Sequence, residues 1–324
     1  MRVVFMGTPE FAVPTLRALV ASGVEVVAAY TQPDRPAGRG RHLMPSPVKV
    51  AALELGVPVL QPASLRPADE VARLADFRPD VIVVAAFGQI LRPNVISIPP
   101  HGILNVHASL LPRWRGAAPI PAAILAGDRE TGVTIMLIDP GLDTGPMLAQ
   151  EAIPIADDDT TASLTAKLAT LGADLLIRTL PDWVAGRVVP VPQDDDRATL
   201  APRIRAEDGF VDWRQPAAQI AREVRAYYPW PGARTFLHRR QLTILSATPV
   251  EGSAEPPGAV VLEGRAGVAV ATGEGLLRLL RVQLEGGKPL DVASFRAGRR
   301  DLAGAILQSR LAADEESSRV HRLN

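Results

Sequence analysis

The sequence predicts an α/β fold in two parts: a Rossmann-like N-terminal domain with a mainly parallel sheet, and a small C-terminal β-barrel. Three observations lead to this prediction. The length of 324 residues suits about two domains of ~150 residues. Apolar strand patterns alternate with helical patterns in the first half, which favours a parallel sheet. Short strands separated by glycine-rich turns fill most of the second half, which is typical of a small barrel.

The expected strands of the N-terminal domain are short apolar runs that end at glycine or at polar residues. They cover residues 3–6, 24–30, 57–60, 81–87, 103–107 and 133–138, and helical patterns cover 68–77 and 120–125. The run at 81–87 is apolar without a break, as expected of a strand that is buried on both faces. Sheets of this kind bind ligands in the crevice at the carboxyl ends of their strands.

A long helix is expected next, beginning after the acidic run 157–159 and ending at Gly186. Residues 188–196 then read as an extended, proline-containing linker. The second half predicts a helix over 217–226, short strands between 235 and 284, and a short helix over 292–296. The predicted boundaries are 1–189 for the first domain, 190–206 for the linker, 207–308 for the second domain and 309–324 for a disordered tail.

Composition excludes several classes of function. The 35 basic and 35 acidic side chains cancel, so nucleic acid would have to bind a local patch. Because there is no cysteine, disulfides, thiolate zinc sites and cysteine nucleophiles are excluded, and no metal-ligand cluster stands out. The central apolar run is too short for a bilayer, which needs ~20 residues, and the N-terminus lacks the features of a signal peptide. We expect a cytoplasmic monomer that binds neither metal nor membrane.

The first candidate site is the pair Asn105 and His107 at the end of the expected strand 103–107. Side chains alternate along a strand, so these two project to one side while Leu104 and Val106 project to the other. An amide and an imidazole side by side can both donate to a carbonyl oxygen that gains negative charge during a reaction. A lone Asn or His is more often structural, and the hypothesis therefore rests on the pair.

Asp143 is the second candidate, 36 residues beyond His107 and between Gly141 and Gly145. Glycine on either side leaves the backbone free to present the carboxylate. A carboxylate near an imidazole can pair with its protonated form and orient a water that carries protons. The alternative is that Asp139 and Asp143 only shape a turn.

The third candidate is the predicted loop 31–49, which has 19 residues and no obvious secondary structure. So long a loop inside a compact domain is usually functional or disordered. Its basic side chains, Arg35, Arg39, Arg41 and Lys49, suit contacts with phosphate. The alternative is a solvated, mobile loop without a ligand.

These motifs together resemble a known family. The Asn105/His107 pair, the run SLLPRWRGAAPI at 109–120 and the aspartate loop at 141–145 are similar to the formyltransferases that use 10-formyltetrahydrofolate. The runs TQPDRPAGRG, LMPSPVK and YYPWPGA resemble the branch of that family that acts on aminoacyl-tRNA. The resemblance extends from Met1 to about Gln308. Pro121 departs from it, since the family more often carries a polar residue there.

The resemblance implies attack by the amino group of methionyl initiator tRNA on the formyl carbon of the folate. Asn105 and His107 would stabilise the oxyanion, and Asp143 would keep His107 protonated and help to move the proton. The C-terminal barrel would resemble an oligonucleotide-binding (OB) fold. The implied folate pocket comprises Phe87, Gly88, Ile90, Leu91, Ser109, Leu110, Leu111 and Pro112. The implied tRNA contacts are Arg35, Arg39, Arg41 and Lys49.

Two other functions stay open at this point. A formyl-folate enzyme acting on a small-molecule or sugar-nucleotide amine would share Asn105, His107 and Asp143, but it would not need the arginine-rich loop or the barrel. A non-catalytic RNA-binding protein on an old enzyme scaffold would not need the Asn/His/Asp set. Folate binding separates the enzymes from the binding protein, and tRNA competition separates the two enzymes.

Overall fold

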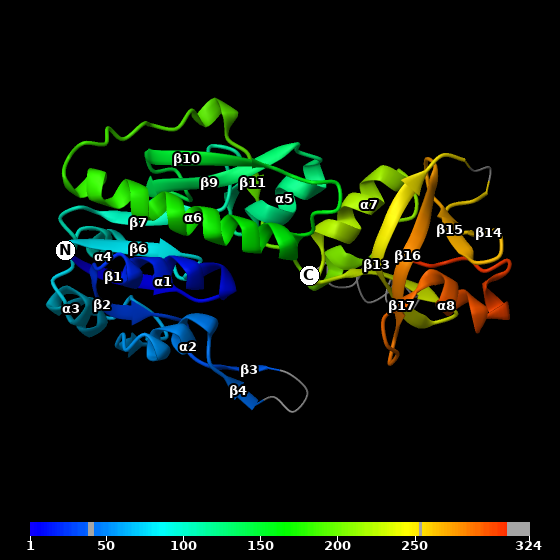
Figure 1. Ribbon diagram of the computed structural model, residues 1–324, viewed down its shortest axis with the longest axis horizontal. Coiled ribbons are helices and arrows are strands. Elements are labelled where there is room, and N and C mark those ends of the chain that lie inside the picture. The colour runs from blue at the N-terminus through cyan, green and yellow to red at the C-terminus, as the bar shows by residue number, and fades with distance from the viewer. Residues whose placement is uncertain (38–41, 253–254, 310–324) are drawn as a thin grey trace, which may run out of the picture. The chain divides into compact units, whose positions relative to one another are not determined.

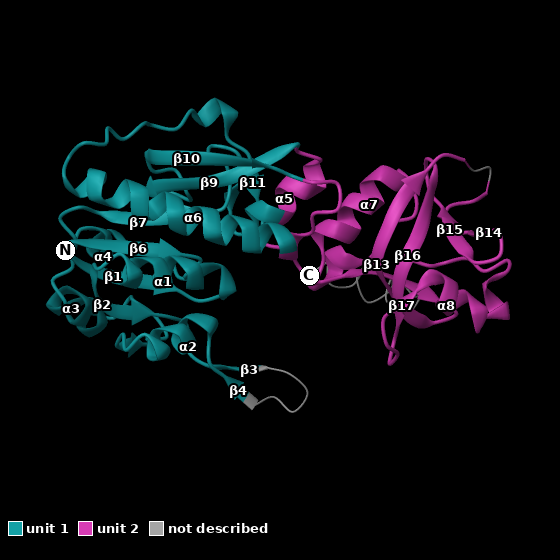
Figure 2. Cartoon of the chain, in the orientation of Figure 1, with its two compact units in different colours: residues 1–120, 129–155, 163–202 teal, residues 121–128, 156–162, 203–324 magenta. Residues whose placement is uncertain are grey.

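The computed structural model describes residues 1–37, 42–252 and 255–309 (Figure 1). They form two compact units, each with its own sheet (Figure 2). Unit 1 comprises residues 1–120, 129–155 and 163–202, and unit 2 comprises 121–128, 156–162 and the residues from 203 onward. The mixed α/β class predicted from the sequence is confirmed. No helix in the described part of the chain is long and apolar enough to cross a membrane.

Unit 1 is built on a seven-stranded sheet of order β10-β9-β7-β6-β1-β2-β5. The five strands from β5 to β7 run parallel, whereas β9 is antiparallel to β7 and β10 is antiparallel to β9. Chain order reverses between the neighbours β1 and β6, which is where such sheets bind ligands. The strands are β1 (Arg2–Gly7), β2 (Glu25–Tyr30), β5 (Val59–Leu60), β6 (Val81–Ala85), β7 (Ile103–His107), β9 (Glu130–Leu137) and β10 (Met147–Pro154).

The apolar runs of the sequence become the centre of this sheet, and every residue of β6 is buried. The helices in this part of the chain are α1 (Val13–Ala21), α2 (Pro47–Glu54), α3 (Ala68–Asp76), α4 (Pro93–Ile96), α5 (Pro119–Ala126) and α6 (Thr161–Val184), and most of α5 belongs to unit 2. Helix α6 packs closely against β7 through Gly172, where a Cβ would lie 2.6 Å from Val106 Cγ1. Strand β10 was not predicted, because its half-exposed residues lack an apolar run.

The prediction of a structureless loop over 31–49 is wrong. A hairpin arm is formed by β3 (Arg35–Ala37) and β4 (His42–Met44), which pair antiparallel (Figure 1). Helix α2 then begins at Pro47, and the Ser46 hydroxyl caps it by accepting a hydrogen bond from the Lys49 amide at 3.1 Å. Serine followed by proline is a helix-start signal that the sequence carried. Arg39 and Arg41 lie outside the described residues.

Residues 191–201, here named the strap, lie on unit 1 rather than running free of it. Val191 pairs with Met147 through two backbone hydrogen bonds of 2.8 and 2.9 Å. A 3₁₀ turn, η2 (Asp195–Arg197), follows, and β11 (Leu200–Ala201) pairs parallel with β8 (Arg115–Gly116). The strap therefore covers the loop that follows β7.

Unit 2 is an antiparallel sheet of order β12-β13-β16-β15-β14, with β17 paired to β16. The segment 305–308 bonds to β12 on one side and to residues 258–260 on the other, so it closes the sheet into a barrel. The elements are α7 (Ala217–Ala226), β12 (Ala233–Leu237), β13 (Arg240–Val250), β14 (Val260–Glu263), β15 (Gly267–Ala271), β16 (Leu276–Leu284), β17 (Leu290–Asp291) and α8 (Val292–Ala297), with 3₁₀ turns at η3 (Ala206–Gly209) and η4 (Arg300–Leu302). The predicted helix 217–226 is confirmed residue for residue. Residues 310–324, where a disordered tail is predicted, lie outside the described part of the chain.

Candidate active site

Asn105 and His107 lie on the same side of β7, as strand alternation predicts. Both are buried, at 9% and 6% exposure. Val106, between them, faces the opposite side and contacts Gly172 of α6. Within the described part of the chain, no hydrogen bond occupies the side-chain amide of Asn105. The side chain keeps some contact with solvent, at 9% exposure, so the amide is available to a ligand that offers an acceptor.

His107 has one ring nitrogen engaged and one that faces a carboxylate. Its Nε2 lies 3.0 Å from the carbonyl oxygen of Trp114. A carbonyl only accepts hydrogen bonds, so Nε2 carries a hydrogen in every protonation state. Nδ1 is therefore the ring nitrogen that faces the site, and it lies 3.8 Å from Asp143 Oδ2. The distance exceeds that of a direct hydrogen bond, so Asp143 does not occupy Nδ1.

The Asp143 carboxylate is fixed by the loop that follows β7. Its Oδ2 accepts a hydrogen bond of 2.8 Å from the Gly116 amide. Asp143 itself has φ +53°, in the left-handed region that residues other than glycine seldom adopt. Gly145 permits the turn, because a Cβ there would lie 1.9 Å from the Leu137 carbonyl oxygen. Asp139 Oδ1 accepts from the Gly141 amide at 3.0 Å and closes the other end of the turn.

The Asp143 loop reaches His107 only by running back along β7. Strand β9 is antiparallel to β7, so the loop begins beside Ile103, whose carbonyl accepts from the Ile138 amide at 2.8 Å. Ile103 and His107 are four residues apart, which is about 13 Å along a strand. The loop that carries the Asp143 carboxylate therefore begins at the opposite end of β7 from His107. The glycines of the loop allow the chain to turn back toward His107.

Two residues that were not predicted from the sequence, Arg115 and Gln193, form a hydrogen-bonded chain that ends on the Asp143 loop. Arg115 is buried, and its guanidinium donates to Gln193 Oε1 at 3.0 Å and to Asp195 Oδ1 at 2.7 Å. Gln193 in turn donates to the carbonyl oxygens of Asp143 and Gly145 at 2.8 and 2.7 Å. Gln193 carried no signal in the sequence, because it lies in a segment that reads as a linker.

The residues predicted to bind folate divide into buried and accessible groups. The side chains of Phe87, Leu91, Ser109 and Leu111 are buried against the protein, and the Ser109 hydroxyl donates to the Arg113 carbonyl at 2.6 Å. The accessible ones are Gly88, Ile90, Leu110 and Pro112. Ile90 is 85% exposed. Both segments follow parallel strands at their carboxyl ends, β6 and β7, as the fold predicts for a ligand site.

The described basic residues predicted to bind tRNA differ in their surroundings. Arg35 is exposed on β3 and donates to Gln32 Oε1 at 3.3 Å. Lys49 Nζ lies 2.6 Å from Asp34 Oδ2, and Gln61 Nε2 donates to Asp34 Oδ1 at 2.7 Å. The hydrogen bond from Lys49, and then the one from Gln61, holds the pKa of Asp34 below its usual value. A phosphate would therefore compete with Asp34 for Lys49, whereas Arg35 is open to solvent.

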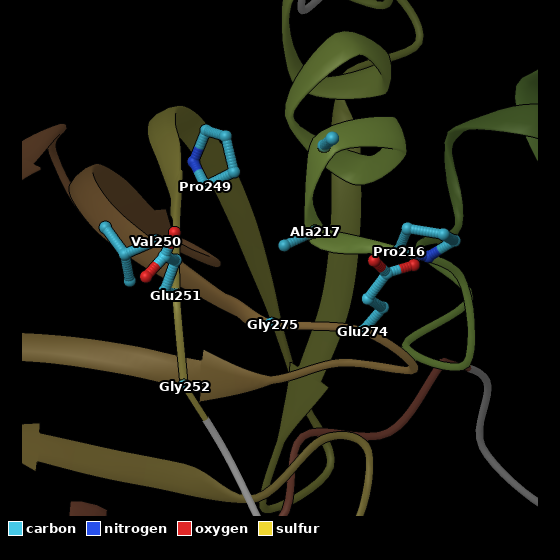
Figure 3. A pocket seen from close by; sticks show the side chains of 9 residues that line it. Pro216, Ala217, Pro249, Val250, Glu251, Gly252, Glu274 and Gly275 are labelled. Carbon is cyan, nitrogen blue, oxygen red and sulfur yellow. The ribbon is translucent and has the colours of Figure 1, made fainter.

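Unit 2 carries a cavity of about 440 Å³ between the start of α7 and the end of β13 (Figure 3). Glu251 and Glu274 are among its lining residues, and none of the described lining residues is basic. Its charge therefore disfavours a phosphate or a folate glutamate. Asn105, His107 and Asp143 belong to unit 1 and are not among the residues that line this cavity.

Comparison with known proteins gives two family matches. Residues 1–180 match the formyl transferase family, and residues 203–300 match the formyl transferase C-terminal domain.

Individual relatives match most of the chain. The methionyl-tRNA formyltransferase of Methylococcus capsulatus is 52% identical over 295 residues, which are 91% of this chain and 96% of that protein. That of Halorhodospira halophila is 51% identical over 308 residues, 95% of this chain and 99% of that protein. The structure of WlaRD, a sugar 3N-formyl transferase in the presence of dTDP and 5-N-formyl-THF, has a TM-score of 0.65. It is 17% identical and covers 89% of this chain and 99% of that one, so the likeness concerns the fold alone.

Proposed function

Because the chain belongs to the formyl transferase family, we propose that it transfers the formyl group of 10-formyltetrahydrofolate to the free amino group of methionyl initiator tRNA. The observation that carries the proposal is the Asn105 side-chain amide, which makes no hydrogen bond among the described residues and lies on the same side of β7 as His107, whose Nδ1 faces Asp143. The relatives at about 50% identity over more than 90% of the chain support the choice of acceptor. The formyl donor is a folate co-substrate.

The role of Asn105 follows from the charge that the reaction creates. The folate supplies a formyl carbon, at which a bond to the incoming amino nitrogen forms and the bond to the folate nitrogen breaks. Negative charge develops on the formyl oxygen between these two events. The Asn105 amide and the His107 Nδ1 hydrogen are the donors that stabilise it, since His107 Nε2 is already bonded to the Trp114 carbonyl.

Asp143 transfers the proton from the amino nitrogen of the acceptor to the folate nitrogen. The amino nitrogen loses a proton once its new bond has formed, and the folate nitrogen gains one as it leaves. His107 carries a hydrogen on both ring nitrogens in this arrangement, so the Asp143 carboxylate, which faces Nδ1 across 3.8 Å, accepts this proton through a water and returns it to the folate nitrogen. The Gly116 amide bonded to Asp143 Oδ2 keeps the carboxylate oriented through the cycle.

The two units take separate roles in this proposal. Residues 1–189 bind folate and carry the chemistry, 190–206 lead to the second domain with the strap docked on unit 1, and 207–308 bind tRNA as an OB-like barrel. The exposed Arg35 of the hairpin arm contacts phosphate near the acceptor end of the tRNA, together with Arg39 and Arg41. The chain works as a monomer in the cytoplasm, where translation begins.

The test is formyl transfer from 10-formyltetrahydrofolate to purified methionyl initiator tRNA, with methionyl elongator tRNA as the control acceptor. We expect transfer to the initiator alone. Transfer to neither tRNA, with folate still bound, would discard the tRNA acceptor and leave a small-molecule amine as the substrate. Absence of folate binding would refute the enzyme itself. The variant Asn105→Ala lacks the side-chain amide. It should still bind folate, but it should transfer the formyl group much more slowly than the wild-type chain.

A further inference from the structure

Gln193 connects three groups of the active-site loops with one side chain. Its Nε2 donates to the carbonyl oxygens of Asp143 and Gly145, and its Oε1 accepts from Arg115 Nε. Carbonyls only accept and a guanidinium only donates, so these partners fix which end of the amide is nitrogen. Glutamine fits this position because it presents two donors and an acceptor in one plane.

The two carbonyls belong to Asp143 and Gly145, so they lie on either side of Thr144 in the loop that carries the Asp143 carboxylate. Asp143 is held at φ +53°, a conformation that its own backbone disfavours. A bond on each side of residue 144 therefore opposes relaxation of the backbone at Asp143. Among the described residues, the Asp143 side chain accepts one hydrogen bond, from the Gly116 amide to Oδ2 at 2.8 Å. The position of the carboxylate therefore depends strongly on the backbone of its loop.

The strap does not depend on Gln193 for its own attachment. Val191 is held to Met147 by paired backbone bonds, and β11 pairs with β8. Thr199 adds a third anchor, since its Oγ1 accepts from the Trp114 amide at 2.9 Å. Removing the Gln193 side chain therefore leaves the strap docked and releases the Asp143 loop. The strap thus touches both partners of His107: Thr199 holds Trp114, and Gln193 holds Asp143.

We propose that Gln193 is a positioning residue for formyl transfer, which holds the Asp143 carboxylate at the distance from which it serves His107. This inference rests on the proposed function, because it takes formyl transfer as the activity. Gln193 acts through Asp143 and touches no reacting atom. A displacement of about 1 Å at a catalytic group can lower a rate about 10²-fold, so loss of the Gln193 hydrogen bonds should have a measurable effect on kcat.

The decisive variant is Gln193→Glu. Glutamate has the same shape and still accepts from Arg115, but it has no hydrogen to donate to the Asp143 and Gly145 carbonyls. We expect kcat to fall about 10- to 100-fold, with KM for folate and for tRNA within about twofold of the wild type. Val191→Ala is the matched control in the same segment, because its side chain is exposed and its backbone bonds persist. Gln193→Ala, which also lacks the donor, carries the same expectation if glutamate is not tolerated.

A double-mutant cycle with Asp143→Asn separates positioning from general damage. If Gln193 acts through Asp143, Gln193→Glu should lower the residual single-turnover rate of Asp143→Asn by less than about twofold. An equal loss in both backgrounds would overturn the inference, as would a Gln193→Glu enzyme within fivefold of wild-type kcat or a similar loss in Val191→Ala. A wild-type chain that formylates neither tRNA would instead overturn the proposed function. The two failures are thereby told apart.

Discussion

Replacing Glu223 with glutamine should make unit 2 more stable than it is in the wild-type chain at pH 8, and should change little at pH 5. Glu223 lies on the buried side of α7 and is 8% exposed. Burial raises the pKa of this carboxyl to about 7, the charge of Asp212 adds to the rise, and the hydrogen bond from Gln215 at 2.9 Å opposes it. The folded unit therefore prefers the protonated form.

The sign follows from proton linkage. Below pH ~4.5 Glu223 is protonated in both the folded and the unfolded chain. Between pH 4.5 and about 7 the folded chain keeps a proton that the unfolded chain has lost, so the stability this proton gives is lost as pH rises through that window. The pKa difference is ~2.5 units, and each unit corresponds to ~1.4 kcal/mol, so ionisation of Glu223 lowers the free energy of unfolding by about 3–4 kcal/mol at pH 8. Glutamine stays neutral, and its side-chain carbonyl still accepts the hydrogen bond from Gln215.

The assay is urea unfolding of the full chain at pH 5 and pH 8. Hydrogen exchange of peptides from β13 and β16, corrected for the intrinsic rate at each pH, reports on unit 2 alone. Glu251→Gln is the matched control, since Glu251 is exposed in the same unit and its replacement should change stability by less than about 0.5 kcal/mol. A wild-type unit 2 whose stability is equal at both pH values, or a Glu223→Gln variant that is less stable at pH 8, would refute the reasoning.

Three further predictions concern unit 1 and its ligands. Asn105→Ala and Asp143→Ala should each lower kcat for formyl transfer about 10²–10³-fold while melting like the wild type, and wild-type turnover in either would contradict the assignment. Gly116→Ala should cost about 1–3 kcal/mol in thermal melting and also lower kcat, because Gly116 has φ +119° and a Cβ there would lie 2.7 Å from the Ala201 carbonyl oxygen. Binding of initiator tRNA should weaken with salt, and Arg35→Ala should flatten the slope of log Kd against log salt by roughly 0.7–0.9; a slope that Arg35→Ala leaves unchanged would argue against this phosphate contact.

Local patterns predicted the elements whose neighbours in sequence decide their structure. The unbroken apolar run at 81–87 became the fully buried β6, and the helical pattern at 217–226 became α7. The elements that local patterns missed are pairings between distant segments. Strand β10 forms by pairing with β9, and β11 forms by pairing with β8, some 85 residues earlier. Such pairings depend on strand order and register, which no short window of sequence encodes.

The candidate site divides in the same way. By itself the sequence determined that Asn105 and His107 share one side of a strand, because the two-residue alternation of a strand is a local property. It also determined that Asp143 sits in a glycine-flanked turn. Only the tertiary structure decided that this turn runs back along β7 to meet His107, since that depends on β9 being antiparallel. Only the tertiary structure brought Gln193 onto the Asp143 loop, because the contact spans 50 residues and exists only once the strap has docked.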